Sequence, residues 1–284
     1  MKYSFLYILV SVMAIVLTEY AIEKIPVIYV LACTNLFAII FFNTLNIKRL
    51  KIVYSMLLNK DLIISVVRVN SLITIMWFCY FFAVSLCGAT DFMLLCYLFV
   101  AVPAGILNRQ LKKITSILIV VIIFFIEFYN QIHIVEGGVI SLIGGTATYF
   151  YFKESETLNK KYNFSSLDVL CIRFYLLVII SMVFVFLDSN VIFNIEQIPY
   201  MIILSILTLI LPLYLAQIGI SKIGAMNHSF FITFMPFLTF ISEDLVFHNL
   251  SWQVLILSLL PPVILNVDYF KQNILLKIRN KNVR

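Results

Sequence analysis

The sequence GATD at residues 88–91 opens an apolar run that is interrupted by Pro103. A similar sequence, GAMN at residues 224–227, opens a second apolar run that is interrupted by Pro236. The separation of Gly88 and Gly224, called the repeat offset below, is close to half the length of the chain. The proline follows sooner in the second copy than in the first, so the match is approximate. Duplicated, interrupted apolar segments are typical of internal repeats around a binding site in a membrane.

The composition indicates that most of the chain is solvated by lipid. Hydrophobic residues make up 63% and charged residues only 12%, against about 45–50% and about 25% in soluble domains. The net charge of +6 comes from short basic clusters between apolar runs, which argues against a nucleic-acid partner. The five cysteines lie in or beside apolar runs without a CxxC pair, as packing residues do. We therefore expect an integral membrane protein without a metal site or cofactor.

Ten apolar runs approach the length of about 20 residues that a helix needs to cross a bilayer. The first run has no small-x-small cleavage site, so it is expected to be a retained helix and not a signal peptide. Residues 46–61 mix basic and apolar side chains, which predicts an amphipathic connector on the inner interface. The predicted spans are residues 3–21, 27–45, 62–85, 89–107, 114–130, 137–153, 168–187, 199–218, 225–242 and 250–269.

The lysine and arginine distribution predicts the orientation. With the N-terminus in the cytoplasm, 17 of the 20 basic residues lie in inner segments, Lys24 lies outside, and Arg68 and Arg173 lie within spans. Both termini are therefore expected in the cytoplasm, most simply at a bacterial cytoplasmic (inner) membrane. Because five is odd, the halves 1–135 and 136–284 would be inserted with opposite orientation. The sequence thus predicts an all-α protein of ten transmembrane helices arranged as two inverted five-helix repeats, with a basic cytoplasmic tail.

Several stretches carry a family resemblance. They are Arg68 followed by WFCYFFA at residues 77–83, the GATD run with its later proline, and RF at residues 173–174. These are similar to segments of the third, fourth and seventh spans of the EamA family, in the drug/metabolite transporter superfamily. The chain resembles that family over nearly its whole length. Glu243 lies near the place of a family glutamate after the ninth span, whereas residues 108–109 carry Asn-Arg where the first half would have one.

The resemblance implies a secondary transporter, and not an enzyme, that works by alternating access around a midplane cavity. Its substrate would be a small polar or amphipathic metabolite, either an amino acid or derivative or a compound like S-adenosylmethionine. Membrane lipids are expected partners, and coupling to protons, exchange and uncoupled flux all fit. A monomer or a weak homodimer is expected. The chain has no GxxxxGK[ST] loop for ATP and no HExxH or GxSxG. The alternatives are a flippase for a lipid-linked substrate and, less favoured, a membrane-embedded lipid-modifying enzyme.

Ionisable side chains within spans are candidate site residues, because each costs about 2.5–3.5 kcal/mol at mid-helix. Arg68 can present its guanidinium to a carboxylate or phosphate, or snorkel to inner headgroups. Arg173 is similarly placed, and a structural role is favoured for it. Asp91 can cap the N-terminus of its helix or act as a proton- or cation-coupling group, with the cap favoured. Glu19, near the outer end of the first span, has no cap role and is the better candidate for a titrating or amine-binding group.

Four further candidates fall in the third and eighth spans, which resemble cavity-lining helices of the family. They are Trp77, Tyr80, Tyr214 and Gln217. Aromatic residues at helical spacing are more often packing or interface residues. Tyr80 and Tyr214 gain weight because a tyrosine recurs in both halves.

The last candidates lie in the two interrupted runs and in the sixth span. Asn227 and His228 enter the ninth span from the inner side, where a histidine serves either as packing or as a proton relay. Pro103 and Pro236 are candidate helix breaks for gating. The small residues GGTAT at 144–148 predict a close approach between helices.

Overall fold

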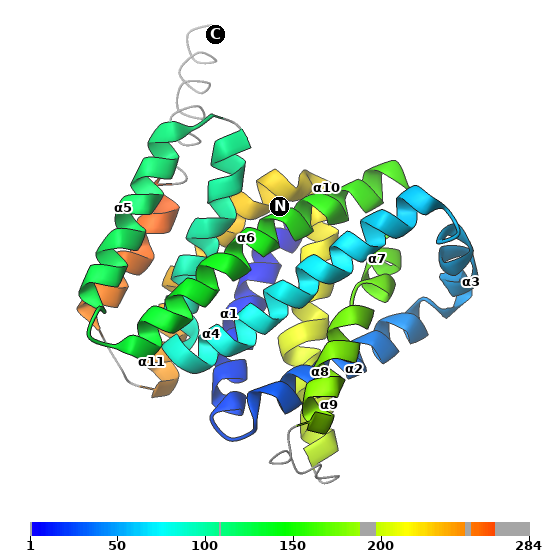
Figure 1. The fold of residues 1–284 in the computed structure, drawn as a ribbon, viewed down its shortest axis with the longest axis horizontal. Coiled ribbons are helices and arrows are strands. Elements are labelled where there is room, and N and C mark those ends of the chain that lie inside the picture. Colours follow the sequence, from blue (N-terminus) through cyan, green and yellow to red (C-terminus); the bar gives the residue numbers. More distant parts are fainter. Residues whose placement is uncertain (1, 108, 188–196, 248–250, 265–284) are drawn as a thin grey trace, which may run out of the picture.

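The computed structural model describes residues 2–107, 109–187, 197–247 and 251–264, and within these ranges the chain forms helices and no strands (Figure 1). The predicted all-α class is therefore confirmed. Five helical segments are long and apolar enough to cross a membrane, namely Lys2–Ile22, Val27–Leu45, Lys60–Leu107, Ser166–Leu187 and Ile198–Ala225. The elements are α1 (Lys2–Ile22), α2 (Val27–Leu45), α3 (Ile47–Met56), α4 (Lys60–Leu107), α5 (Leu111–Glu127), α6 (Ile132–Lys161), α7 (Ser166–Ile172), α8 (Tyr175–Leu187), α9 (Ile198–Ser205), the π-helix η2 (Ile206–Ile210), α10 (Leu211–Ile232), α11 (Met235–Phe247) and a further apolar helix, Trp252–Ile264.

Helices α4 and α10 each contain one residue whose backbone is not helical. Gly88 has φ 81° and ψ 170° within α4, and Gly224 has φ 80° and ψ 160° within α10. An L-residue with a side chain rarely adopts these angles, whereas glycine does so readily. Figure 1 shows α4 changing direction part-way along its length. The repeated glycines of the sequence are therefore the points at which two long apolar stretches bend.

Helix α6 packs closely against both limbs of α4 through glycines. A Cβ placed on Gly145 would clash with the backbone oxygen of Cys96 in the second limb, and one on Gly144 would lie 2.9 Å from Cys79 Cβ in the first. Gly137 has a similar approach, 2.8 Å, to Cys87 Cβ. The predicted close approach of the 144–148 segment is confirmed, because only residues without a side chain allow this separation of backbones.

The predicted connector at residues 46–61 contains a helix, α3, which is tied to the start of α7. Asp168 is fully buried and its carboxylate accepts a hydrogen bond from Asn46 Nδ2 at 2.8 Å and lies 3.0 Å from the Arg49 guanidinium. The same carboxylate accepts from Ser165 N, whose side chain accepts from Asp168 N, which is a capping box. This cluster fixes α7 against the α2–α3 corner.

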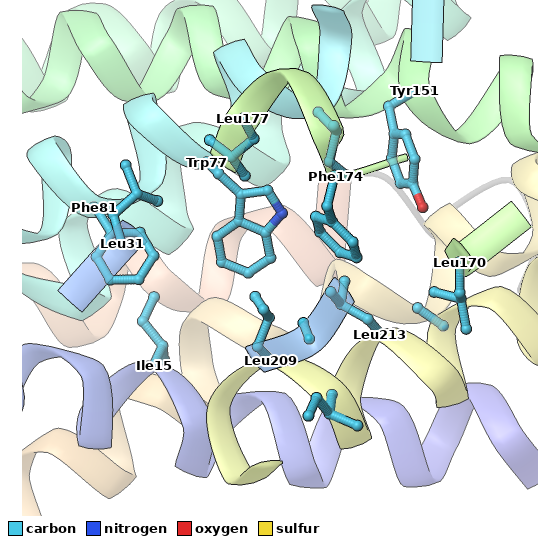
Figure 2. Packing of buried hydrophobic residues seen from close by; sticks show 14 of the residues in the cluster. Ile15, Leu31, Trp77, Phe81, Tyr151, Leu170, Phe174, Leu177, Leu209 and Leu213 are labelled. Carbon is cyan, nitrogen blue, oxygen red and sulfur yellow. The ribbon is translucent and has the colours of Figure 1, made fainter. Parts of the chain in front are cut away.

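The core divides into two clusters of buried apolar side chains. The larger joins α1, α2, α3, both limbs of α4, α6 to α10 and part of α11, and Figure 2 shows its centre, with Trp77, Tyr151 and Phe174. The smaller joins the second limb of α4 to α5 and to Trp252–Ile264. The candidate site described next lies inside the larger cluster.

Candidate functional site

A small cavity of about 70 Å³ lies among α1, α4, α6 and the η2–α10 segment. Its lining is rich in aromatic residues and, within the described part of the chain, contains no charged side chain. Pro212, near the start of α10, lines it directly after the π-turn of Ile206–Ile210, and a proline cannot donate the backbone hydrogen bond that a regular helix requires there. The lining residues are Tyr7, Ser11, Ala14, Met76, Trp77, Tyr80, Phe92, Met93, Cys96, Tyr97, Thr148, Tyr151, Phe152, Thr208, Pro212, Leu213 and Ala216.

The lining residues of the cavity include pairs of positions, one in each half of the chain, that have a nearly constant separation along the sequence. Positions in α4 and α10 are related by the repeat offset of the two bent glycines, and positions in α1 and α6 by that offset plus one. The recurring pairs are Met76 and Pro212, Trp77 and Leu213, Tyr80 and Ala216, Ser11 and Thr148, and Ala14 and Tyr151. Corresponding faces of two pairs of helices therefore surround one space.

Three of the four predicted residues of the third and eighth spans lie at this cavity. Trp77 and Tyr80 line it with ring centroids 4.9 Å apart, and the Tyr80 hydroxyl donates to Thr18 Oγ1 at 3.3 Å. Gln217 is fully buried beside it, and its Oε1 accepts from the Tyr151 hydroxyl at 3.4 Å. Tyr214 is 37% exposed and does not line the cavity.

Arg173 lies behind Tyr151 at the break between α7 and α8. Its side chain is fully buried, and its Nη1 donates to the Tyr151 hydroxyl. The guanidinium carbon lies 4.7 Å from the centroid of Phe174 and 5.4 Å from that of Tyr151. Asn70 of α4 bridges this break: its Nδ2 donates to Ile172 O at 2.7 Å, and its Oδ1 accepts from Leu176 N at 3.3 Å.

At the bend of α4, carboxylates from distant helices lie close to the free N–H groups that follow Gly88. Glu243 Oε2 of α11 accepts from Thr90 N at 2.8 Å and from the Thr90 hydroxyl. Glu19 of α1 lies against the same bend, where its Oε1 would be 3.1 Å from a Cβ placed on Gly88. Asp91 is buried, and its Oδ1 has no hydrogen-bond partner among the described residues. The predicted residues Glu19 and Asp91 are thus brought together at one helix N-terminus, where negative charge is favoured.

The bend of α10 is bound in a related way. Glu156 of α6 accepts from Ala225 N at 3.1 Å through Oε2, and a Cβ on Gly224 would lie 3.2 Å from Glu156 Oε1. Lys160 Nζ lies 2.5 Å from the same carboxylate. Glu19 and Glu156 have the same separation along the chain as the paired cavity residues of their two helices, α1 and α6.

The remaining predicted residues lie elsewhere. Arg68 is exposed on α4, with its Nη1 3.8 Å from Glu154 Oε1, and does not line the cavity. His228 is fully buried, with Nδ1 3.1 Å from Ser4 Oγ and its ring 5.0 Å from that of Tyr7. The side chain of Asn227 lies outside the described residues.

The two predicted helix-breaking prolines are both buried, at different places in their helices. Pro103 lies within the second limb of α4, close to its end at Leu107. Pro236 is the second residue of α11, directly after the interruption between α10 and α11. The break in the second half therefore coincides with its proline, whereas the assigned helix continues through Pro103.

Sequence reasoning missed Tyr151, Glu156 and the central position of Arg173. The signal for Glu156 was present, because it follows Glu19 at only one position more than the repeat offset. Arg173 and Arg68 carry the same side chain at similar depth in their predicted spans. Arg173 falls at the break between α7 and α8 and is buried, whereas Arg68 lies on an exposed face of α4.

Comparison with known proteins places the fold but not the function. No family model and no curated protein matches the chain. A solved structure described only as "Crystal structure of protein" matches it with a TM-score of 0.61 at 13% identity, covering 92% of this chain and 93% of that one. At this identity the likeness concerns the fold alone, and it extends over nearly the whole of both chains.

Proposed function

We propose that the protein is a secondary transporter of the EamA type in a bacterial cytoplasmic membrane. In this proposal ten spans form two inverted five-helix repeats, and a small polar or amphipathic metabolite passes through the aromatic cavity by alternating access. The observation that carries the proposal is the cavity lining, in which residues separated by the repeat offset, or by one position more, meet around one space. Binding at the interface of inverted repeats, next to discontinuous helices, is the arrangement of secondary transporters.

The two bends supply the elements that such a transporter needs to close each end. Glu243 ties α11 to α4 after Gly88, and Glu156 ties α6 to α10 after Gly224. Under the proposed topology the first bend faces the outside and the second faces the cytoplasm. Both connections are made in the present conformation, and the cavity of about 70 Å³ has room for a few waters at about 10–15 Å³ each. We assign this conformation to a closed intermediate of the cycle.

Uptake and counterflow in proteoliposomes test the proposal. The panel comprises amino acids, S-adenosylmethionine, nucleotides, amphipathic cations and aromatic carboxylic acids. Ala216→Trp should fill the cavity and abolish flux, because Ala216 is 4% exposed and lies in its wall. Tyr214→Trp is the matched control on the outward face of the same helix and should retain flux. Absence of flux for every compound, or full activity of Ala216→Trp, would exclude transport through this cavity.

One observation favours a second candidate, a flippase for a lipid-linked substrate. An apolar groove of about 600 Å³ runs between α2, α4 and α8, lined by residues such as Val27, Ile75, Phe78 and Phe184. It is large enough for acyl or isoprenoid chains, and its position on the lipid-facing side suits them. Movement of a fluorescent lipid-linked sugar between leaflets, blocked by Ile75→Trp and not by Ala216→Trp, would favour this candidate over the first.

A further inference from the structure

Arg173 is a buried cation for which the described part of the chain supplies no anion. Its side chain has 0% exposure, and its Nε and Nη2 atoms have no hydrogen-bond partner there. No carboxylate in the described ranges lies within 4.0 Å of its guanidinium. Burial of one charge carries a large desolvation penalty, which two cation–π contacts offset only in part. The described part of the chain therefore leaves this charge undercompensated.

The unpartnered polar atoms around the cavity are mostly donors. Besides the two nitrogens of Arg173, Nε2 of Gln217 and Nε1 of Trp77 are buried without a partner among the described residues. These atoms are N–H groups that can donate but not accept. The lining includes no Asp or Glu within the described residues. A ligand that satisfies this set must present acceptors and a negative charge.

Backbone geometry at the α7–α8 break adds to the same preference. The 13-residue helix α8 begins at Tyr175, two residues after Arg173, so its positive dipole end adds to the positive potential at this break. Asn70 stabilises the break by accepting a hydrogen bond from Leu176 N and donating one to Ile172 O. Tyr151, which the guanidinium bonds, forms part of the cavity wall, and Figure 2 shows it with Phe174 and Trp77 in the same buried cluster.

We infer that Arg173, with the Tyr151 hydroxyl, binds the carboxylate of a monoanionic substrate whose apolar or aromatic body lies against Trp77 and Tyr80. This inference rests on the proposed function, since it takes the aromatic cavity to be the transport site. The single charge of the guanidinium balances one carboxylate, whereas a doubly charged phosphate would keep an unbalanced charge. An ammonium group finds no carboxylate among the described residues of this wall and is repelled by Arg173, so we expect amphipathic cations to bind more weakly than anions.

The two tryptophans of the chain make a direct binding test practicable. Trp252 is 70% exposed, and Trp77 lines the cavity. In a Trp252→Phe background reconstituted into lipid nanodiscs, the fluorescence of Trp77 reports occupancy. The probes are phenylpropionate, phenylpropylamine and phenylalanine, which share a phenyl body and differ in charge. We expect phenylpropionate to bind most tightly, phenylalanine more weakly, and the amine not at all.

Variants of Arg173 assign the charge preference to this residue. Arg173→Gln should weaken phenylpropionate binding by roughly 10- to 100-fold, and Arg173→Lys should weaken it less, because the charge remains and the planar fork is lost. Arg68→Gln, which removes an exposed arginine from α4, should leave the affinity unchanged. Size-exclusion profiles establish that each variant is folded. The wild-type comparison of acid and amine needs no variant, so the test holds even if Arg173→Gln misfolds.

The outcomes separate this inference from the transport proposal. Binding of the amine as tight as that of the acid, or unchanged acid binding in Arg173→Gln, overturns the carboxylate site. If flux of some cationic compound is then found, the proposal of transport through the cavity is supported although the carboxylate site is rejected. Conversely, Arg173-dependent binding of phenylpropionate with no flux of any compound supports the anion site and rejects the transporter.

Discussion

Glu243→Gln should loosen the closed end of the protein at the bend of α4. The carboxylate of Glu243 bonds both the backbone N–H, at 2.8 Å, and the hydroxyl of Thr90, and so joins α11 to α4. Hydrogen bonds to a charged group contribute about 1.5–3 kcal/mol, against about 0.5–1.5 kcal/mol for neutral ones. The favourable interaction with the helix N-terminus adds about 0.3–1 kcal/mol. Glutamine keeps one acceptor oxygen, so the closed state loses about 1–3 kcal/mol before other charges are considered.

Like-charge repulsion works against this loss. Glu19 and Asp91 interact electrostatically with Glu243 at the same helix N-terminus. Neutralising Glu243 relieves part of that repulsion. The net destabilisation of the closed state therefore lies at the lower end of the range of about 1–3 kcal/mol, at about 1 kcal/mol. A change of this size shifts the opening equilibrium roughly fivefold.

Cys87 provides a native reporter for this opening. It precedes Gly88, is 9% exposed, and lines a small cavity with Asp91 and Glu243. With the other four cysteines replaced, a membrane-impermeant maleimide added from outside should label Cys87 roughly fivefold faster in Glu243→Gln. Asp244→Asn is the matched control, since it removes a charge at the same cavity and leaves the bonds to Thr90 in place. Unchanged or slower labelling in Glu243→Gln, or an equal increase in the control, would refute the reasoning.

Three substitutions test the fold through the midpoint of thermal unfolding in detergent. Gly88→Ala forces a side chain into φ 81°, ψ 170° and should cost about 1–3 kcal/mol; a midpoint equal to wild type would contradict the strained bend. Gly145→Ala should be at least as harmful, because its Cβ would clash with a backbone oxygen of α4. Gly105→Ala is the milder comparison and should stay within about 1 kcal/mol, because its Cβ would meet only side-chain atoms of Ile114, the nearest being Cγ1 at 3.0 Å. Asn70→Leu leaves two backbone groups of the α7–α8 break unbonded and should cost about 2 kcal/mol; no loss would mean that the break needs no support.

Much of the fold could be predicted from the sequence because hydrophobic length and glycine act locally. Long apolar runs become helices wherever backbone groups cannot bond to water, and α1 and α2 fall within one residue of their predicted ends. Gly88 and Gly224 were recognisable because only glycine readily takes their backbone angles. The basic, mixed composition of residues 46–61 likewise identified α3 as a separate element.

Side-chain direction could not be predicted, because it depends on neighbours from other parts of the chain. The pairing of Tyr80 with Tyr214 falls two positions short of the repeat offset that relates the cavity walls of α4 and α10. Two positions turn a helix by about 200°, which places Tyr214 on the exposed face and Ala216 in the cavity.

The two bends are secured by different groups, and under the proposed topology charge selection across the membrane accounts for the difference. In the first half, Glu243 from the other half bonds the segment after Gly88, and Glu19 from its own half lies against Gly88. After Gly224, Glu156, which is the counterpart of Glu19 along the chain, bonds Ala225 N. The counterpart of Glu243, one repeat offset earlier, falls at the end of α4, where the sequence continues with Asn-Arg at 108–109 and has no glutamate. Under the proposed topology this segment faces the cytoplasm, where basic residues are favoured. The connection between halves that Glu243 makes at the outer bend therefore has no glutamate counterpart one repeat offset earlier, and the segment after Gly224 is instead joined to the first half through His228 and Ser4.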